Sequence, residues 1–346
     1  MKKILVFIVT ALALCACQPS LEQNRWESDT YHALSALIAD PQNKGSYAVF
    51  DCDYTTVVND ISHSLITYMI ENLRFATAPE HMFLAGLPEV DVPLEGIGMT
   101  AREMGETLAR EYAELKTEWK DSLYQDFRAR FVAFQDAIGD YYDYGTLCLW
   151  EPSIAVGFSP EELQALGRES LSYWLSQGRS WLEEWKSPDG RFSGTVRKGL
   201  ILTTEMKDLY RKLAQAGITP YVCSASPEWL VELLCCDKAF GLGLPAERVY
   251  GLRFIDREDG TWGYDETYPQ PYKEGKVACI NKFIAPLHGQ RGPVLVAGDS
   301  NGDVAMLTAY PEMKVGLIID WNRTGEIAAL AARHDGRYFS QKFELN

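Results

Sequence analysis

The segment Tyr47–Phe50 constrains the fold of this chain most, because its apolar run stops abruptly at two carboxylates, Asp51 and Asp53. The run is short, rich in branched and aromatic residues, and preceded by a glycine and a serine, which is typical of a buried parallel strand. Groups just beyond the carboxyl end of such a strand lie where open α/β sheets bind ligands. The segment therefore predicts a parallel sheet with a polar site at its edge.

The rest of the sequence alternates strands and helices on either side of a long segment without strand patterns. From about residue 73 to residue 192, apolar residues recur at helical spacing, which predicts an all-helical insertion. The capping box Ser159-Pro160-Glu161-Glu162 begins one of its helices. The order of predicted strands and helices favours an α/β fold, in which a doubly wound parallel sheet is split by an insertion after its first strand. Helices are expected over residues 26–38, 61–73, 103–119, 122–138, 159–175, 203–216, 227–234, 275–284, 303–307 and 324–332, and strands over 47–50, 218–223, 249–255, 261–264, 293–297 and 315–319.

The first 17 residues resemble the signal segment of a bacterial lipoprotein. Lys2 and Lys3 precede an apolar stretch, residues 4–14, that is too short to span a bilayer. The Leu-Cys-Ala-Cys motif at residues 14–17 resembles a lipobox in which Cys17 takes the lipid. Ordinary signal cleavage nearby is the alternative. We therefore expect an exported lipoprotein, held by its anchor on the periplasmic side of a membrane in the cell envelope.

The net charge and the cysteine pattern narrow the classes of ligand that this chain could bind. The 346 residues carry a formal net charge of -15, with 33 basic and 48 acidic side chains, which argues against general binding of nucleic acid. No cysteine or histidine spacing typical of zinc occurs, so the cysteines beyond the signal segment are expected to be mostly buried free thiols. The predicted organisation is a signal segment of residues 1–17, a core of residues 18–72 and 193–346, and a helical insertion of residues 73–192.

Polar residues gather at predicted strand ends and helix starts. Because the carboxyl ends of parallel strands meet at one edge of a sheet, these side chains are expected to converge. Several carboxylates crowded together require a cation, and an all-oxygen donor set favours Mg²⁺. A lysine and a serine beside such a metal suit a phosphoryl group. Taken singly, the serine is more typical of a helix cap and the lysine of a solvated surface. The converging residues are Asp51, Asp53, Thr55, Ser224, Lys276, Asp299 and Asp303.

These positions resemble the four motifs of haloacid dehalogenase-like (HAD) hydrolases. Residues 51–55 follow the pattern DxDxT and residues 298–303 the pattern GDSxxD, with Ser224 and Lys276 between them. The insertion resembles the helical C1 cap of that superfamily, and the resemblance implies a Rossmann-like core and an aspartyl-phosphate mechanism. The second aspartate, Asp53, is lacking in the dehalogenases and phosphonatases of the superfamily, so the resemblance is to its phosphatase branch.

The resemblance also implies a role for each motif residue. Lys273 competes for the role of the motif lysine, but Lys276 follows Gly275 at the start of a predicted helix and is the better match. The implied roles are nucleophile and Mg²⁺ ligand for Asp51, general acid–base and carbonyl metal ligand for Asp53, phosphate binding for Thr55, Ser224 and Lys276, and Mg²⁺ binding for Asp299 and Asp303.

A closer resemblance, over residues 44–65, 221–234, 249–254, 292–307 and 321–323, is to exported bacterial phosphorylcholine phosphatases. It implies a phosphomonoester hydrolase with phosphocholine as the leading substrate. Another small monoester, such as phosphoserine or a sugar phosphate, is the first alternative, and a non-catalytic ligand-binding lipoprotein is the second. Choline would require an aromatic cage with a nearby acid. The tyrosines at 141–144, near Trp150 and Glu151, form the most cage-like cluster, although any single ring there is more typical of helix-packing core.

Overall fold

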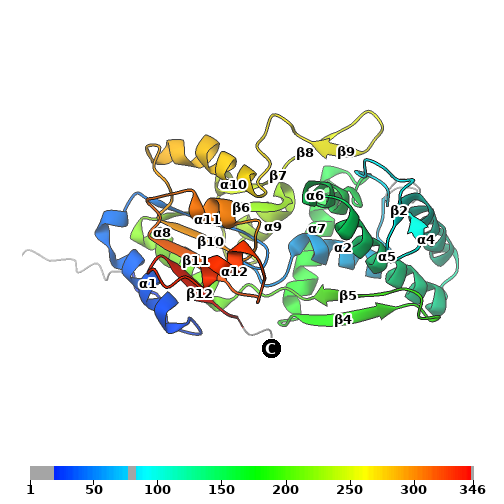
Figure 1. Ribbon diagram of the computed structural model, residues 1–346, viewed down its shortest axis with the longest axis horizontal. Helices are drawn as coiled ribbons and strands as arrows, with labels where there is room; N and C mark the ends of the chain where they lie inside the picture. The colour runs from blue at the N-terminus through cyan, green and yellow to red at the C-terminus, as the bar shows by residue number, and fades with distance from the viewer. Residues whose placement is uncertain (1–18, 77–82, 344–346) are drawn as a thin grey trace, which may run out of the picture.

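The structure, a computed structural model, describes residues 19–76 and 83–343, so the predicted signal segment and Cys17 lie outside the described residues. Its centre is a sheet of six parallel strands (Figure 1). The strand at residues 47–50 is hydrogen-bonded on both sides and all four of its residues are buried, as expected for a central parallel strand. In spatial order the strands are β12 (Tyr338–Gln341), β11 (Val315–Ile319), β10 (Leu295–Gly298), β1 (Tyr47–Phe50), β6 (Thr219–Pro227) and β7 (Val249–Leu252).

Helices cover both faces of this sheet, which confirms the doubly wound architecture. Side chains alternate along a strand, so Ala48 and Phe50 point to one face and Tyr47 and Val49 to the other. Gly217 ends one covering helix, α8 (Thr204–Ala216), in a left-handed conformation, which a glycine adopts without strain. The first face packs against α1 (Ser28–Ala39), α8 and α9 (Glu228–Cys236), and the second against α10 (Glu274–Cys279) with its π-helical extension Ile280–Ile284, α11 (Val304–Thr308) and α12 (Glu326–Ala331).

The insertion after β1 forms a second body beside the sheet (Figure 1). The predicted capping box is present, since Ser159 Oγ accepts from the Glu162 amide and the Glu162 carboxylate accepts from the Ser159 amide. One helix, α6, was not predicted; it begins after Asp143, whose side chain accepts from the Thr146 amide at 2.8 Å. The helices of this part are α2 (Ile61–Glu71), α4 (Ala101–Thr117), α5 (Asp121–Tyr141), α6 (Tyr144–Ser153) and α7 (Pro160–Ser176).

The expectation of an all-helical insertion is corrected by two antiparallel strand pairs. The pair β2 (Pro93–Leu94) and β3 (Met99–Thr100) is short, whereas β4 (Trp181–Lys186) pairs with β5 (Ser193–Lys198) along its whole length. The turn between β4 and β5 closes a hairpin, where the Ser187 amide donates to the Phe192 carbonyl, instead of leading directly back to the sheet. The expected boundary between residues 192 and 193 therefore falls inside this hairpin.

A third hairpin projects from the core toward α6 (Figure 1). It pairs β8 (Phe254–Asp256) with β9 (Trp262–Tyr264), while the first half of the expected strand 249–255 joins the central sheet as β7. The Tyr264 hydroxyl donates to the Gly145 carbonyl at 2.7 Å, so the hairpin holds the beginning of α6. Over residues 19–76 and 83–343, no helix has both the length and the apolar character needed to cross a membrane.

Candidate active site

The predicted site residues come together because their strands are neighbours in the sheet. Phe50 of β1 pairs with Ala297 of β10 on one side and with Val222 of β6 on the other. Asp51 follows β1 directly and Asp299 follows β10 directly. Parallel strands end at the same edge, so this register sets the two carboxylates side by side at the carboxyl edge.

Lys276, on α10, joins two of the carboxylates. Its Nζ lies 2.6 Å from Asp51 Oδ1 and 2.6 Å from Asp303 Oδ1, and all three side chains are buried. Burial lowers the pKa of Lys276, but the carboxylates of Asp303 and Asp51 outweigh it and raise that pKa above its ordinary value. Lys273, the other candidate lysine, lies instead at the cavity wall, with its Nζ 5.6 Å from the ring centre of Tyr144.

Asp303 also fixes the loop that carries Asp299. Its Oδ2 accepts from the amides of Asp299 at 3.0 Å and Ser300 at 3.1 Å, so both oxygens of this fully buried carboxylate have partners. Gly298 is needed for this approach, since a Cβ at that position would come within 2.4 Å of Asp303 Cβ. The Gly-Asp-Ser sequence thus places Asp299 toward the cavity.

Three carboxylates fit a divalent cation. One oxygen from each of Asp51, Asp299 and Asp303 lies within 4.8 Å of the others, and all three residues are buried. Burial, followed by repulsion from Asp303, raises the pKa of Asp51 to about 8, and the same two causes raise the pKa of Asp299. An all-oxygen site whose charges repel one another suits a hard cation such as Mg²⁺. Arg323, to which the sequence alone assigned no role, donates to Asp299 Oδ2 at 3.1 Å.

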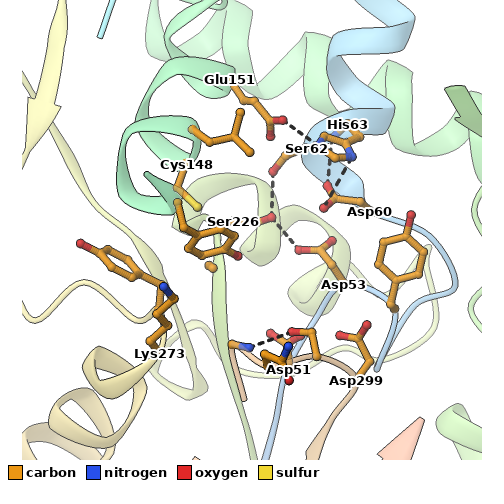
Figure 2. A pocket seen from close by; sticks show the side chains of 18 of the residues that line it. Asp51, Asp53, Asp60, Ser62, His63, Cys148, Glu151, Ser226, Lys273 and Asp299 are labelled. Atoms are coloured by element: carbon orange, nitrogen blue, oxygen red, sulfur yellow. Dashed lines mark hydrogen bonds and ion pairs between the residues drawn. The ribbon is translucent and has the colours of Figure 1, made fainter. Parts of the chain in front are cut away.

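Asp53 has a separate set of partners on the side of the cavity nearest α2 (Figure 2). Its Oδ1 accepts from the Ile61 amide at 2.8 Å, and its Oδ2 accepts from the Ser226 hydroxyl at 2.6 Å. Ser226 Oγ lies in turn 2.7 Å from Ser62 Oγ. Burial, followed by repulsion from Asp60, raises the pKa of Asp53 to about 8. A proton carrier with a pKa near neutrality is suited to general acid–base chemistry.

The remaining two motif residues do not line the cavity. Thr55 is buried and its Oγ1 has no hydrogen-bond partner among the described residues. Ser224 is also buried, and its Oγ accepts from the Ser226 amide at 3.1 Å and lies 3.5 Å from Asp53 Oδ2. Phosphate binding by Thr55 and Ser224 therefore stays a prediction.

Four of the motif residues line a cavity of about 530 Å³ between the core and α6, namely Asp51, Asp53, Lys276 and Asp299. Cap residues Tyr144 and Glu151 line it, together with Tyr272 from the core. His63 of α2 contacts α6, because its Nε2 lies 2.6 Å from Glu151 Oε1 (Figure 2). Burial lowers the pKa of His63, but the Glu151 carboxylate and then Asp60 outweigh it and raise the pKa to about 10.

Two of the aromatic rings in the cap are packing residues, as the sequence favours for a single ring there. Trp150 is fully buried and its indole N–H donates to the Phe83 carbonyl at 2.9 Å. Trp174 is also buried and donates to the Ser64 carbonyl at 2.8 Å. Of the tyrosines at 141–144, only Tyr144 lines the cavity. The rings around the cavity are thus Tyr54, Tyr144 and Tyr272, with Asp60 and Glu151 as nearby acids.

Comparisons with known proteins agree with this geometry. Residues 165–308 match the family described as haloacid dehalogenase-like hydrolase. The chain is 26% identical over 321 residues to the phosphorylcholine phosphatase of Pseudomonas aeruginosa, which covers 85% of this chain and 80% of that protein. A crystal structure of a conserved protein of unknown function from Anaerococcus prevotii is also similar, with a TM-score of 0.80 at 26% identity, over 94% of this chain and 99% of the other.

Proposed function

We propose that this chain, a haloacid dehalogenase-like hydrolase of the phosphatase branch, hydrolyses a small phosphomonoester through a phosphorylated Asp51, with phosphocholine as its leading substrate. The observation that carries the proposal is the contact of Lys276 with both Asp51 and Asp303, beside Asp299, at the floor of one cavity. A nucleophile, a buried cation and a proton carrier are thereby gathered where one phosphoryl group would fit.

The reaction divides between the two aspartates that follow β1. Asp51 attacks phosphorus, the bond from phosphorus to the ester oxygen breaks, and Asp53 gives its proton to that leaving oxygen. Water then attacks the phosphoryl group on Asp51 and passes a proton to Asp53, which releases inorganic phosphate and restores both carboxyl groups. Lys276 orients Asp51 and offsets the charge that develops on the phosphoryl oxygens.

We propose that Asp51, Asp299 and Asp303, with the Asp53 carbonyl, hold Mg²⁺. The bound cation would neutralise the carboxylates and the phosphoryl oxygens during transfer. Neutralisation would also release the protons that burial and repulsion otherwise retain on Asp51. Asp51 would then be ionised and able to act as the nucleophile at neutral pH.

Choline release is favoured by the similarity to the Pseudomonas phosphatase and by the cavity lining. The tyrosine rings at positions 54, 144 and 272 and the carboxylates of Asp60 and Glu151 suit a quaternary ammonium group. The test compares kcat/KM for phosphocholine, phosphoserine, a sugar phosphate and 4-nitrophenyl phosphate, each with Mg²⁺. We expect phosphocholine to have the highest value. A value no higher than that for 4-nitrophenyl phosphate would reject choline as the recognised group.

A catalytic role also separates this proposal from a ligand-binding lipoprotein that has lost its activity. Full activity of Asp51→Asn would contradict the assignment of Asp51 as the nucleophile. No hydrolysis of any monoester by the native chain in the presence of Mg²⁺ would favour the binding protein. We further propose that Cys17 carries the lipid that holds the chain in the cell envelope. Cells supplied with a labelled fatty acid should label the native protein and leave Cys17→Ala unlabelled; equal labelling would exclude that anchor.

A further inference from the structure

The hydroxyl of Ser226 holds the proton carrier of the site. Its Oγ donates to Asp53 Oδ2 at 2.6 Å, and the only other hydrogen bond to that oxygen among the described residues is a long one, from Ser224 Oγ at 3.5 Å. Ser226 is 3% exposed, and it lines the cavity at the end of β6. A buried hydroxyl so close to a carboxylate oxygen fixes where that oxygen points.

The direction of the hydrogen bonds follows from the number of protons. A serine hydroxyl carries one proton, so when Ser226 donates to the Asp53 carboxylate it accepts from Ser62, whose Oγ is 2.7 Å away. Ser62 is 7% exposed and occupies the second position of α2. While Asp53 is a carboxylate, the hydrogen bonds therefore run from Ser62 through Ser226 to Asp53, and the Ser226 hydroxyl proton points at Asp53 Oδ2.

Both oxygens of Asp53 are restrained as a result. The Ile61 amide holds Oδ1 at 2.8 Å and Ser226 holds Oδ2, one from α2 and one from β6. Two donors from different elements stop the carboxyl group from rotating and keep its remaining lone pairs toward the cavity. With Ser226 removed, only the Ile61 amide would hold the group firmly.

We propose that Ser226, oriented by Ser62, is a positioning residue that aims the Asp53 carboxyl group at the leaving oxygen of the substrate. This inference rests on the proposed function, in which Asp53 donates a proton as the phosphorus–oxygen bond breaks. The orientation of the Asp53 carboxyl group affects the rate only for leaving groups that need a proton from it. Phenolate and alkoxides need it, whereas 4-nitrophenolate is stable enough to leave without it.

The test is Ser226→Ala, assayed with phenyl phosphate and 4-nitrophenyl phosphate, which bind through similar rings. We use kcat/KM because it reports the step in which the leaving group departs. General acid catalysis contributes about 100-fold to 10,000-fold, and loss of aim forfeits part of it, so we expect a fall of about tenfold to a hundredfold for phenyl phosphate. The fall for 4-nitrophenyl phosphate should be under about threefold. Ser62→Ala should change the two values in the same direction by less.

Two further variants control for structure. Ser226→Thr keeps the hydroxyl and should restore the native ratio between the two substrates. Ser153→Ala removes a buried hydroxyl whose one hydrogen bond within the described part of the chain is to the Leu149 carbonyl of α6, and it should leave the ratio unchanged. An equal loss on both substrates in Ser226→Ala, or no loss on either, overturns the inference. A native protein that hydrolyses neither ester overturns the proposed function itself.

Discussion

Replacing Asp303 by asparagine should destabilise the chain strongly, although the two side chains have the same shape. One oxygen of Asp303 accepts from Lys276 at 2.6 Å, and the other accepts from the Asp299 and Ser300 amides. An asparagine side chain has one oxygen and one amide donor, so in either orientation its NH₂ group would face a donor. The lost charge-assisted bond amounts to about 1.5–3 kcal/mol and the unsatisfied buried donor to about 1–3 kcal/mol. We expect the free energy of unfolding to fall by about 3–5 kcal/mol.

Urea unfolding in EDTA measures this effect without any contribution from a bound cation. Asp299→Asn is the matched control, because Asp299 neighbours the same carboxylates, but among the described residues its side chain accepts a hydrogen bond from Arg323 only. An asparagine oxygen can still accept that bond, and the substitution removes a charge whose ionisation is opposed by burial and by Asp303. The control should be as stable as the native chain or more stable. A loss under about 1 kcal/mol in Asp303→Asn, or equal losses in both variants, would refute the reasoning.

Three further outcomes follow from the geometry. In EDTA the urea concentration at the unfolding midpoint should fall as the pH rises from 5 to 8. The pKa values of Asp51 and Asp53 are raised to about 8 in the folded chain, so the stabilisation from these two groups is complete below the ordinary pKa of 3.8 and is lost as the pH rises through about 8. Mg²⁺ should weaken this pH dependence, and a midpoint that rises with pH in EDTA would contradict the two shifts. Gly298→Ala should lower the free energy of unfolding by about 1–3 kcal/mol or more. Gly302→Ala, whose Cβ would meet only Ser300 Oγ at 3.3 Å, should lower it much less in the same assay. Equal losses in the two variants would contradict the close approach of Asp303 to Gly298. A double-mutant cycle of His63→Gln and Glu151→Gln should give a coupling free energy of only about 1 kcal/mol, because the His63 side chain is 42% exposed and solvent screens the ion pair. A coupling free energy above about 3 kcal/mol would contradict this exposure, because only a pair shielded from water couples so strongly.

Five of the six sheet strands and the motif residues could be predicted because each depends on a local pattern, whereas the edge strand β12 was not predicted. Continuous apolar runs mark strands buried on both faces, and the polar residues that end them need no long-range information to be located. The recognition of a HAD-like phosphatase from Asp51, Ser224, Lys276 and Asp299 is confirmed by the match of residues 165–308 and by the similarity to the Pseudomonas phosphatase. Burial of Cys52 between the two aspartates also follows from alternation along the chain.

The rest depended on contacts between distant segments. The helix α6 has no apolar stripe of its own, so its residues show only a weak helical periodicity in the sequence. It is held in place by contacts with α2, α5 and the β8–β9 hairpin. The pair of His63 and Glu151 joins residues 88 positions apart, and no local pattern predicts it. Ser226 did carry a signal, because it stands two residues after Ser224 on one strand and therefore shares its face.

The central claim is that Asp51 carries the phosphoryl group during turnover. Rapid acid quenching of the reaction with 4-nitrophenyl phosphate and Mg²⁺, followed by mass spectrometry of the peptide around residue 51, tests it directly. We expect one added phosphoryl group on Asp51 in the native chain and none in Asp51→Asn. More should accumulate in Asp53→Asn, because the water step lacks its base. A phosphoryl group on another residue, or turnover with none on the chain, would contradict the account.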